Sequence, residues 1–191
     1  MNTDLKKFLG KYVNLSETEL EDVANRFNRK SIKKNEHLLK QGEGCKDLVF
    51  VEKGCLRLYY VKDGVEVSVW FAFEQSSAVE IYSFISGNPS EYYLQAIEDT
   101  EVLYLPKSEL NALYRIQPKM QEMMRRFWED VILNLINRFT ALQTDSAEKR
   151  YLDLLDKPAY MEAIPQKYLA SFIGVTPTSL SRIRKQILKS H

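Results

Sequence analysis

The C-terminal stretch from Ile164 to Lys185 has the sequence pattern of two short helices joined by a tight corner. Gly174 tolerates the left-handed backbone conformation that ends a helix abruptly. Thr176 then suits the N-cap of a second helix, and Pro177 suits its first turn because no amide is left unpaired there. This spacing predicts a helix-turn-helix, which constrains the end of the chain to a compact helical unit.

The second helix of this unit is predicted to be amphipathic. Its apolar positions, Leu180, Ile183 and Ile187, fall on one face. The faces open to solvent carry polar side chains, namely Thr178, Ser179, Arg182, Lys185 and Lys189. From residue 164 onward there is no Asp or Glu, although the whole chain has a formal net charge of only +1. This local positive charge favours a helix that enters the DNA major groove. A helical hairpin with a solvated basic face is the alternative.

Length and composition fit two small domains, since 191 residues with 45% hydrophobic content can bury adequate cores. No apolar stretch is long enough to span a bilayer, so we expect a cytoplasmic protein with no membrane partner. Cys45 and Cys55 form no disulfide framework, and His37 and His191 form no His-rich metal site. We therefore expect no metal site, no cofactor and no catalytic residues, which argues against a cupin-type enzyme.

The hydrophobic pattern of the N-terminal part of the chain changes from helical spacing to alternation. An N-terminal helical segment, with Ser16 and Glu19 as a capping box, gives way near Ser31 to short alternating runs separated by turn residues. The clearest strands are 48–51, 56–61, 65–73, 92–97 and 102–105, and Asp63-Gly64 suits a two-residue hairpin turn. These runs predict a small antiparallel roll or barrel.

A long helix is predicted from about residue 118 to 142 because apolar residues recur there at helical spacing. The band is broad enough to cover the β domain on one side and a second copy of the helix on the other. We assign the dimer interface to Met120, Met124, Phe127, Val131 and Leu135. The alternative is simply a core helix. A hinge at 143–146 then gives three parts: residues 1–117, a sensor domain; 118–143, a dimerisation helix; and 144–191, a helix-turn-helix domain.

This order of parts resembles the Crp/Fnr family of bacterial transcription regulators. The most specific matches are 146–155 and 164–182, which are similar to the branch common in Bacteroidetes, and weaker matches are 38–43 and 50–54. The resemblance implies an α+β fold. It would comprise a jelly-roll-like, antiparallel β roll of the cyclic-nucleotide-binding type with flanking helices, a long dimerisation helix, and a helix-turn-helix of winged-helix type with a truncated wing.

The resemblance also locates an effector pocket. The family's Gly-Glu-Leu motif corresponds to Val79-Glu80-Ile81, and its phosphate-gripping Arg-Ser pair falls on Ser90-Glu91. A phosphate beside an acid, with no Arg from residue 58 to 114, predicts weak or absent cyclic AMP binding. The candidate pocket residues are Glu80, Ile81, Ser90, Glu91 and Tyr92, with the effector unknown or absent. Glu80 is either a ligand contact or a cap for local backbone amides.

For DNA, the resemblance places the second helix of the unit in the major groove. Arg182 is then the candidate for bidentate contact with guanine, and Thr178 and Ser179 are candidates for other base edges. The candidates for phosphate contacts are Lys167, Thr176, Ser181, Lys185 and Lys189. The implied function is a homodimer that reads a pseudo-palindromic operator, with RNA polymerase as a further candidate partner. A sensor or interaction module that does not bind DNA is the alternative function, and a constitutive binder is as consistent as a switched one.

Overall fold

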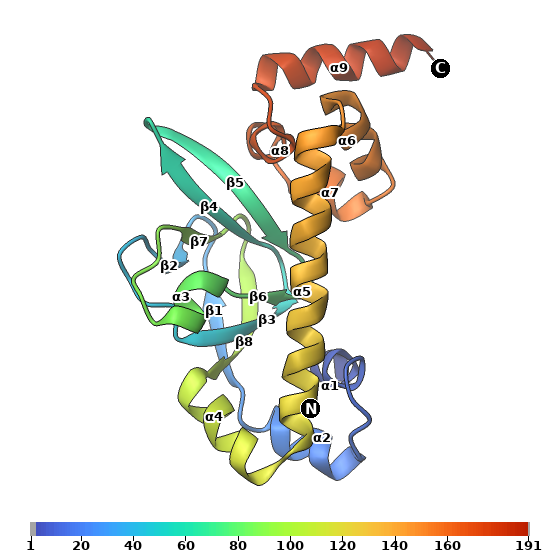
Figure 1. The fold of residues 1–191 in the computed structure, drawn as a ribbon. Helices are drawn as coiled ribbons and strands as arrows, with labels where there is room; N and C mark the ends of the chain where they lie inside the picture. The colour runs from blue at the N-terminus through green and yellow to red at the C-terminus, as the bar shows by residue number, and fades with distance from the viewer. Residues whose placement is uncertain (1–2, 191) are drawn as a thin grey trace.

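The computed structural model describes residues 3–190, which form a β roll, a long helix and a helical C-terminal domain (Figure 1). The helices are α1 (Thr3–Gly10), α2 (Glu17–Ala24), α3 (Ile81–Ser86), α4 (Lys107–Ile116), α5 (Lys119–Thr144), α6 (Ala147–Leu155), α7 (Pro158–Ala163), α8 (Gln166–Ile173) and α9 (Pro177–Ser190). The strands are β1 (Asn28–Ile32), β2 (His37–Leu39), β3 (Asp47–Lys53), β4 (Leu56–Lys62), β5 (Val65–Ala72), β6 (Ser77–Ala78), β7 (Tyr93–Ala96) and β8 (Thr100–Pro106).

The β roll consists of two four-stranded antiparallel sheets, with strand orders β1-β8-β3-β6 and β2-β7-β4-β5. Their inner faces share one core because residues such as Val51, Leu56 and Val102 are fully buried between them. This arrangement confirms the predicted antiparallel roll. The hairpin between β4 and β5 turns at Asp63 and Gly64, which both have positive φ, at 51° and 75°. Positive φ at both central residues is typical of a type I′ turn and fits the expected two-residue hairpin turn.

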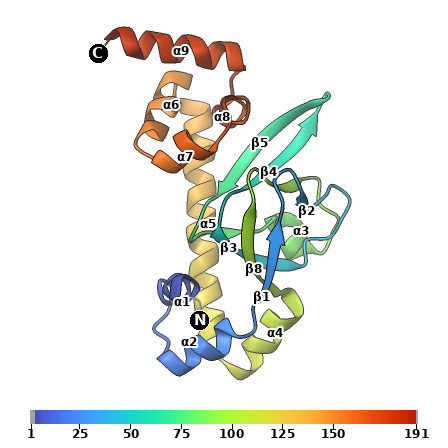
Figure 2. The same ribbon diagram turned by 180° about the vertical axis from the view of Figure 1, so that it is seen from behind.

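The N-terminal half of α5 packs on this core, alongside α1 and α2 (Figure 2). Met120, Met124 and Phe127 are buried within this one chain. Their assignment to a dimer interface is therefore wrong, because the roll and α1 already cover them. Val131 is half-buried against the same core, and Leu135 is the first of the five predicted residues to be exposed. A broad apolar band alone did not distinguish these two environments along the helix.

The C-terminal domain is built from α6 to α9 within the described range. Its small core includes Tyr151, Leu169, Phe172 and Leu180. Ser146 caps α6 through its hydroxyl, as the sequence predicts, by accepting a bond from the amide of residue 149. One boundary differs from the prediction. The expected hinge is shorter, because α5 stays helical through residue 144. None of the helices in this described range is both long enough and apolar enough to cross a membrane.

Candidate nucleic-acid interface and effector cavity

The corner between α8 and α9 has the predicted helix-turn-helix geometry. Gly174 adopts the left-handed conformation, with φ 79° and ψ 33°, which a residue with a Cβ rarely tolerates. Thr176 caps α9 because its hydroxyl accepts a hydrogen bond from the Ser179 amide at 3.2 Å. Leu180 is fully buried against α8 and ties the two helices together. The corner therefore fixes α9 rigidly relative to α8.

The outer face of α9 is polar, cationic and open. Thr178, Arg182, Lys185 and Lys189 are exposed, and no acidic residue lies on the helix. In the ribbon views α9 crosses the end of the molecule farthest from α1 and α2, with the roll below it (Figure 1). These four residues are brought together on one open surface.

The other predicted DNA-binding residues already have partners within the chain. Ser179 is half-buried, and its hydroxyl lies 3.0 Å from that of Thr176. The Ser181 hydroxyl donates to the Pro177 carbonyl and accepts from the Gln166 side chain, so it joins α9 to α8. These hydroxyls position the helix, and their contact with DNA stays a prediction.

Two further cations of the domain are engaged with other groups. Lys167 lies on α8, where its Nζ is 4.0 Å from Glu66 Oε2 of β5. The Lys167 side chain is exposed, but it already lies close to the Glu66 carboxylate. Its assignment as a phosphate contact therefore stays a prediction. Arg184, which was not assigned to DNA, turns inward and donates to the Tyr151 hydroxyl at 3.0 Å.

A cavity of about 760 Å³ opens between the β roll, α3 and α5. Its volume lies in the range that holds a drug-sized molecule. Apolar and aromatic side chains dominate the lining, among them Leu58, Trp70, Val79, Tyr92 and Val131. Of the predicted effector residues, Glu80, Ile81 and Tyr92 line this cavity, whereas Ser90 and Glu91 are not among its lining residues. The sequence therefore located the cavity but not all of its wall.

Glu80 caps the N-terminus of α3. Its carboxylate is almost fully buried and accepts one bond from the Tyr82 amide at 3.0 Å and one from the Ser83 amide at 2.9 Å. This is the N-cap role that the sequence left open as an alternative. Since both oxygens are occupied, a ribose hydroxyl would have to compete with the start of the helix for them.

The cavity does not fit the cyclic phosphate that the resemblance would imply as a ligand. Ser90 is buried and its hydroxyl bonds with the backbone of Tyr92, while Glu91 is an exposed acid. Lys11 is the one cation in the described lining, and it is ion-paired with Asp130 at 2.8 Å. A phosphate in this site would therefore lack a free cationic partner in an apolar setting, which is costly.

Comparison with known proteins agrees with this architecture. Residues 29–117 match the family model of the cyclic nucleotide-binding domain. Electron transport regulator A of Shewanella oneidensis is 21% identical over 184 residues, covering 90% of this chain and 72% of that one. The fumarate and nitrate reduction regulatory protein of Escherichia coli K12 is 22% identical over 189 residues, covering 92% and 75%.

Solved structures share the whole fold. FixK2 from Bradyrhizobium japonicum superposes with a TM-score of 0.72 at 18% identity, covering 86% of this chain and 85% of that one. A CooA mutant from Carboxydothermus hydrogenoformans gives 0.72 at 16% identity, covering 100% and 86%.

A β roll joined by one long helix to a helix-turn-helix is the architecture that these comparisons support. Residues 29–117 form a cyclic nucleotide-binding domain, and the chain is homologous to transcription regulators of the Crp/Fnr type. That family is made up of regulators rather than enzymes. The alternative of an interaction module that lacks DNA-binding architecture is not favoured by these relatives.

Sequence reasoning missed one polar contact, which joins the β4–β5 hairpin to α8. Ser171 of α8 contacts Ser68 of β5 across 2.8 Å, and the buried Arg57 of β4 lies beside them. The signal that was present is an arginine between apolar residues near the start of a strand that stays apolar and aromatic up to its final Lys62.

Proposed function

We propose that the protein binds double-stranded DNA as a homodimer and reads a pseudo-palindromic operator with α9 in the major groove. The observation that carries this proposal is the acid-free cationic face of α9, which is exposed at the end of the chain and held by a capped, glycine-cornered turn. Two such helices related by a two-fold axis would meet half-sites about one helical turn apart. We place the protein in the cytoplasm and assign it no catalytic role, with RNA polymerase as a further candidate partner.

The dimer seam is proposed on the C-terminal half of α5. Ile132, Leu135, Phe139 and Leu142 are all exposed in the single chain. Their spacing of three, four and three residues is that of a coiled-coil seam. These residues follow directly after the part of α5 that the β roll covers, so α5 would serve first as a core helix and then as a dimer helix. The proposed division is a sensor domain in 1–117, the helix in 118–143 and the reading domain in 144–191.

Arg182 is the proposed base-reading residue. Replacing it with alanine is expected to cost about 1–3 kcal/mol of specific binding and to relax preference at one base pair per half-site. The measurement is selection of binding sites from a random duplex pool at physiological salt, carried out with both proteins. Lys185→Ala is the matched control, since loss of a phosphate contact should weaken all sequences alike. An unchanged consensus in the Arg182 variant would refute the assignment.

Cyclic AMP is expected to leave thermal unfolding unchanged, even at millimolar concentration, because the cavity offers a phosphate no free cation. A ligand at 100 times its Kd would stabilise the folded state by about 2.7 kcal/mol, which a melting curve resolves readily. The measurement is the melting temperature of the full chain as the nucleotide is titrated, with AMP as the control. A saturable rise specific to the cyclic nucleotide would show that the cavity takes it after all.

A further inference from the structure

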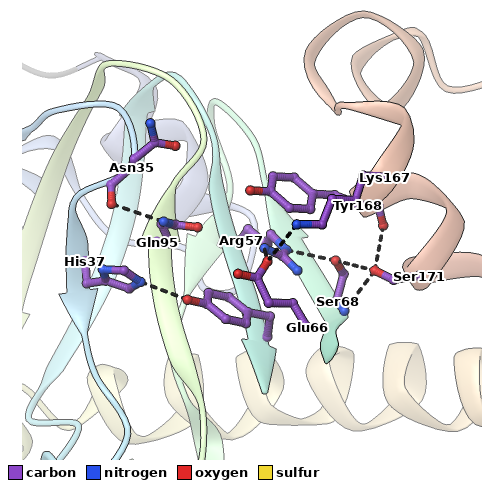
Figure 3. A network of polar contacts seen from close by, with 10 residues as sticks. Asn35, His37, Arg57, Glu66, Ser68, Gln95, Lys167, Tyr168 and Ser171 are labelled. Atoms are coloured by element: carbon purple, nitrogen blue, oxygen red, sulfur yellow. Dashed lines mark hydrogen bonds and ion pairs between the residues drawn. The ribbon is translucent and has the colours of Figure 1, made fainter. Parts of the chain in front are cut away.

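A buried arginine lies at the junction between the β4–β5 hairpin and α8 (Figure 3). The side chain of Arg57 is 0% exposed. Its Nε donates to Ser68 Oγ at 2.8 Å, and its Nη1 donates to Glu66 Oε2 at the same distance. Its remaining terminal nitrogen, Nη2, is buried and has no hydrogen-bond partner among the described residues. Desolvating a guanidinium is costly, so its surroundings must compensate for that cost.

Part of the compensation comes from the other domain. The guanidinium carbon of Arg57 lies over the ring of Tyr168, a residue of α8, at 3.7 Å from the ring centroid. It also lies over the ring of Tyr59 of β4, at 4.2 Å. Arginine interacts favourably with aromatic faces, and more strongly where water is excluded. The charge buried in the sensor domain is therefore stabilised in part by the helix-turn-helix domain.

A second layer of contacts runs beside the arginine. The Ser171 hydroxyl of α8 accepts a bond from the Ser68 amide at 3.1 Å and lies 2.8 Å from the Ser68 hydroxyl. Lys167 of α8 faces Glu66, as described above. The α8 contacts come from positions 167, 168 and 171, which share one face of a helix, and the β5 contacts come from 66 and 68, which share one face of a strand. The two elements thus meet along matching faces.

We propose that Arg57 is a positioning residue that holds α8 and α9, the reading helices, against the β4–β5 hairpin. We call this contact the lock. Because α8 and α9 move as one unit around Leu180, an orientation imposed on α8 is imposed on α9. The domain is also attached through α5, where Arg138 donates to the Phe172 carbonyl at 2.7 Å, and through an aromatic cluster in which Phe71 of β5 packs against Tyr160 and Phe172. The arginine contact is the charged part of this junction. The effect of this positioning on DNA binding rests on the proposed function, whereas the positioning of the two domains does not.

The same strand gives the lock a route to the cavity. Val69, Trp70 and Phe71 of β5 line the cavity, and Ser68 beside them contacts α8. A shift of β5 at the cavity therefore acts directly on the contact that holds the reading helices. This route is shorter than one that passes through the length of α5.

Two substitutions at Tyr168 separate positioning from folding. Tyr168→Leu removes the ring over the guanidinium without touching the β roll. Tyr168→Phe is the matched control, because it keeps the ring and removes only a hydroxyl that makes no hydrogen bond to the described residues. Arg57→Met removes the charge from the sensor side while keeping an apolar side chain of comparable length. The leucine variant keeps the test valid if the methionine variant folds poorly.

The experiment measures the distance between the hairpin and α9 in the absence of DNA. Spin labels are placed at Val65→Cys and Leu188→Cys, both exposed sites, and labelled chains are diluted with unlabelled chain so that only distances within one chain are read. The two native cysteines are buried, and burial raises the pKa of the Cys45 thiol to about 11, so they resist labelling.

We expect one narrow distance distribution in the parent and in Tyr168→Phe, and a broad one in Tyr168→Leu and Arg57→Met. The distance distribution of the combined Tyr168→Leu and Arg57→Met variant should be no broader than that of either substitution alone. Operator affinity should fall on the order of tenfold in the two broadened variants. Narrow, unchanged distributions in both variants, or fully additive broadening in the double variant, would overturn the lock. Broadening in a protein that binds no DNA would refute the proposed function and leave the lock standing.

Discussion

Phe139→Glu is expected to convert the dimer into monomers and to weaken operator binding by about 100-fold or more. Phe139 is 61% exposed on α5, so glutamate costs little within one chain. In the proposed dimer, two such carboxylates would face each other across an apolar seam, where burying unpaired charge is strongly unfavourable. Each monomer would then hold one half-site and lose the gain of the second contact. Sedimentation velocity measures the dissociation, and operator titration measures the loss of affinity.

The matched control is Ile116→Glu, which places the same charge at another exposed apolar residue, 63% exposed on α4 and away from the seam. This variant should stay dimeric and bind DNA as the parent does. If Phe139→Glu also stays dimeric with parental affinity, the seam on α5 is wrong. A dimer that persists but no longer binds operator DNA would mean that α5 orients the helix-turn-helix domains without joining the two chains.

The helix-turn-helix was predictable in detail because its signals are local. Gly174, Thr176 and Pro177 each specify a backbone conformation by their own chemistry, whatever surrounds them. The two-residue hairpin turn at Asp63 and Gly64 was predictable for the same reason. Alternation and turn spacing predicted a small antiparallel roll or barrel, and the structure has antiparallel strands in two sheets.

What could not be predicted depends on contacts between distant segments. The burial of Met120 and the exposure of Phe139 are set by where the β roll ends against α5, and both residues look equally apolar in the sequence. Arg57 is buried between Tyr59 of its own strand and Tyr168, which lies far along the chain. The cap formed by Glu80 was one of two alternatives, and the burial of its carboxylate decided between them.

Leu180→Ala is expected to destabilise the C-terminal domain by about 2–5 kcal/mol and to abolish operator binding. The side chain is 0% exposed and joins α9 to α8 in a core of few residues, so little can collapse into the space it leaves. The main core of the β roll does not include Leu180, so its unfolding should be nearly unaffected, although Cys55, Phe71 and Ile97 of the roll belong to the same cluster as Leu180. The measurement is chemical unfolding monitored by amide hydrogen exchange, which reports the stability of each domain separately.

Leu188→Ala is the control, because it makes the same chemical change on the same helix at a side chain that is 79% exposed. It should alter stability by no more than about 0.5 kcal/mol. Equal effects of the two variants would mean that α9 does not pack as described. Loss of protection in the roll as well as in the reading domain would mean that the contact between α8 and β5 couples the unfolding of both domains. The lock at Arg57 would then contribute to stability as well as to orientation.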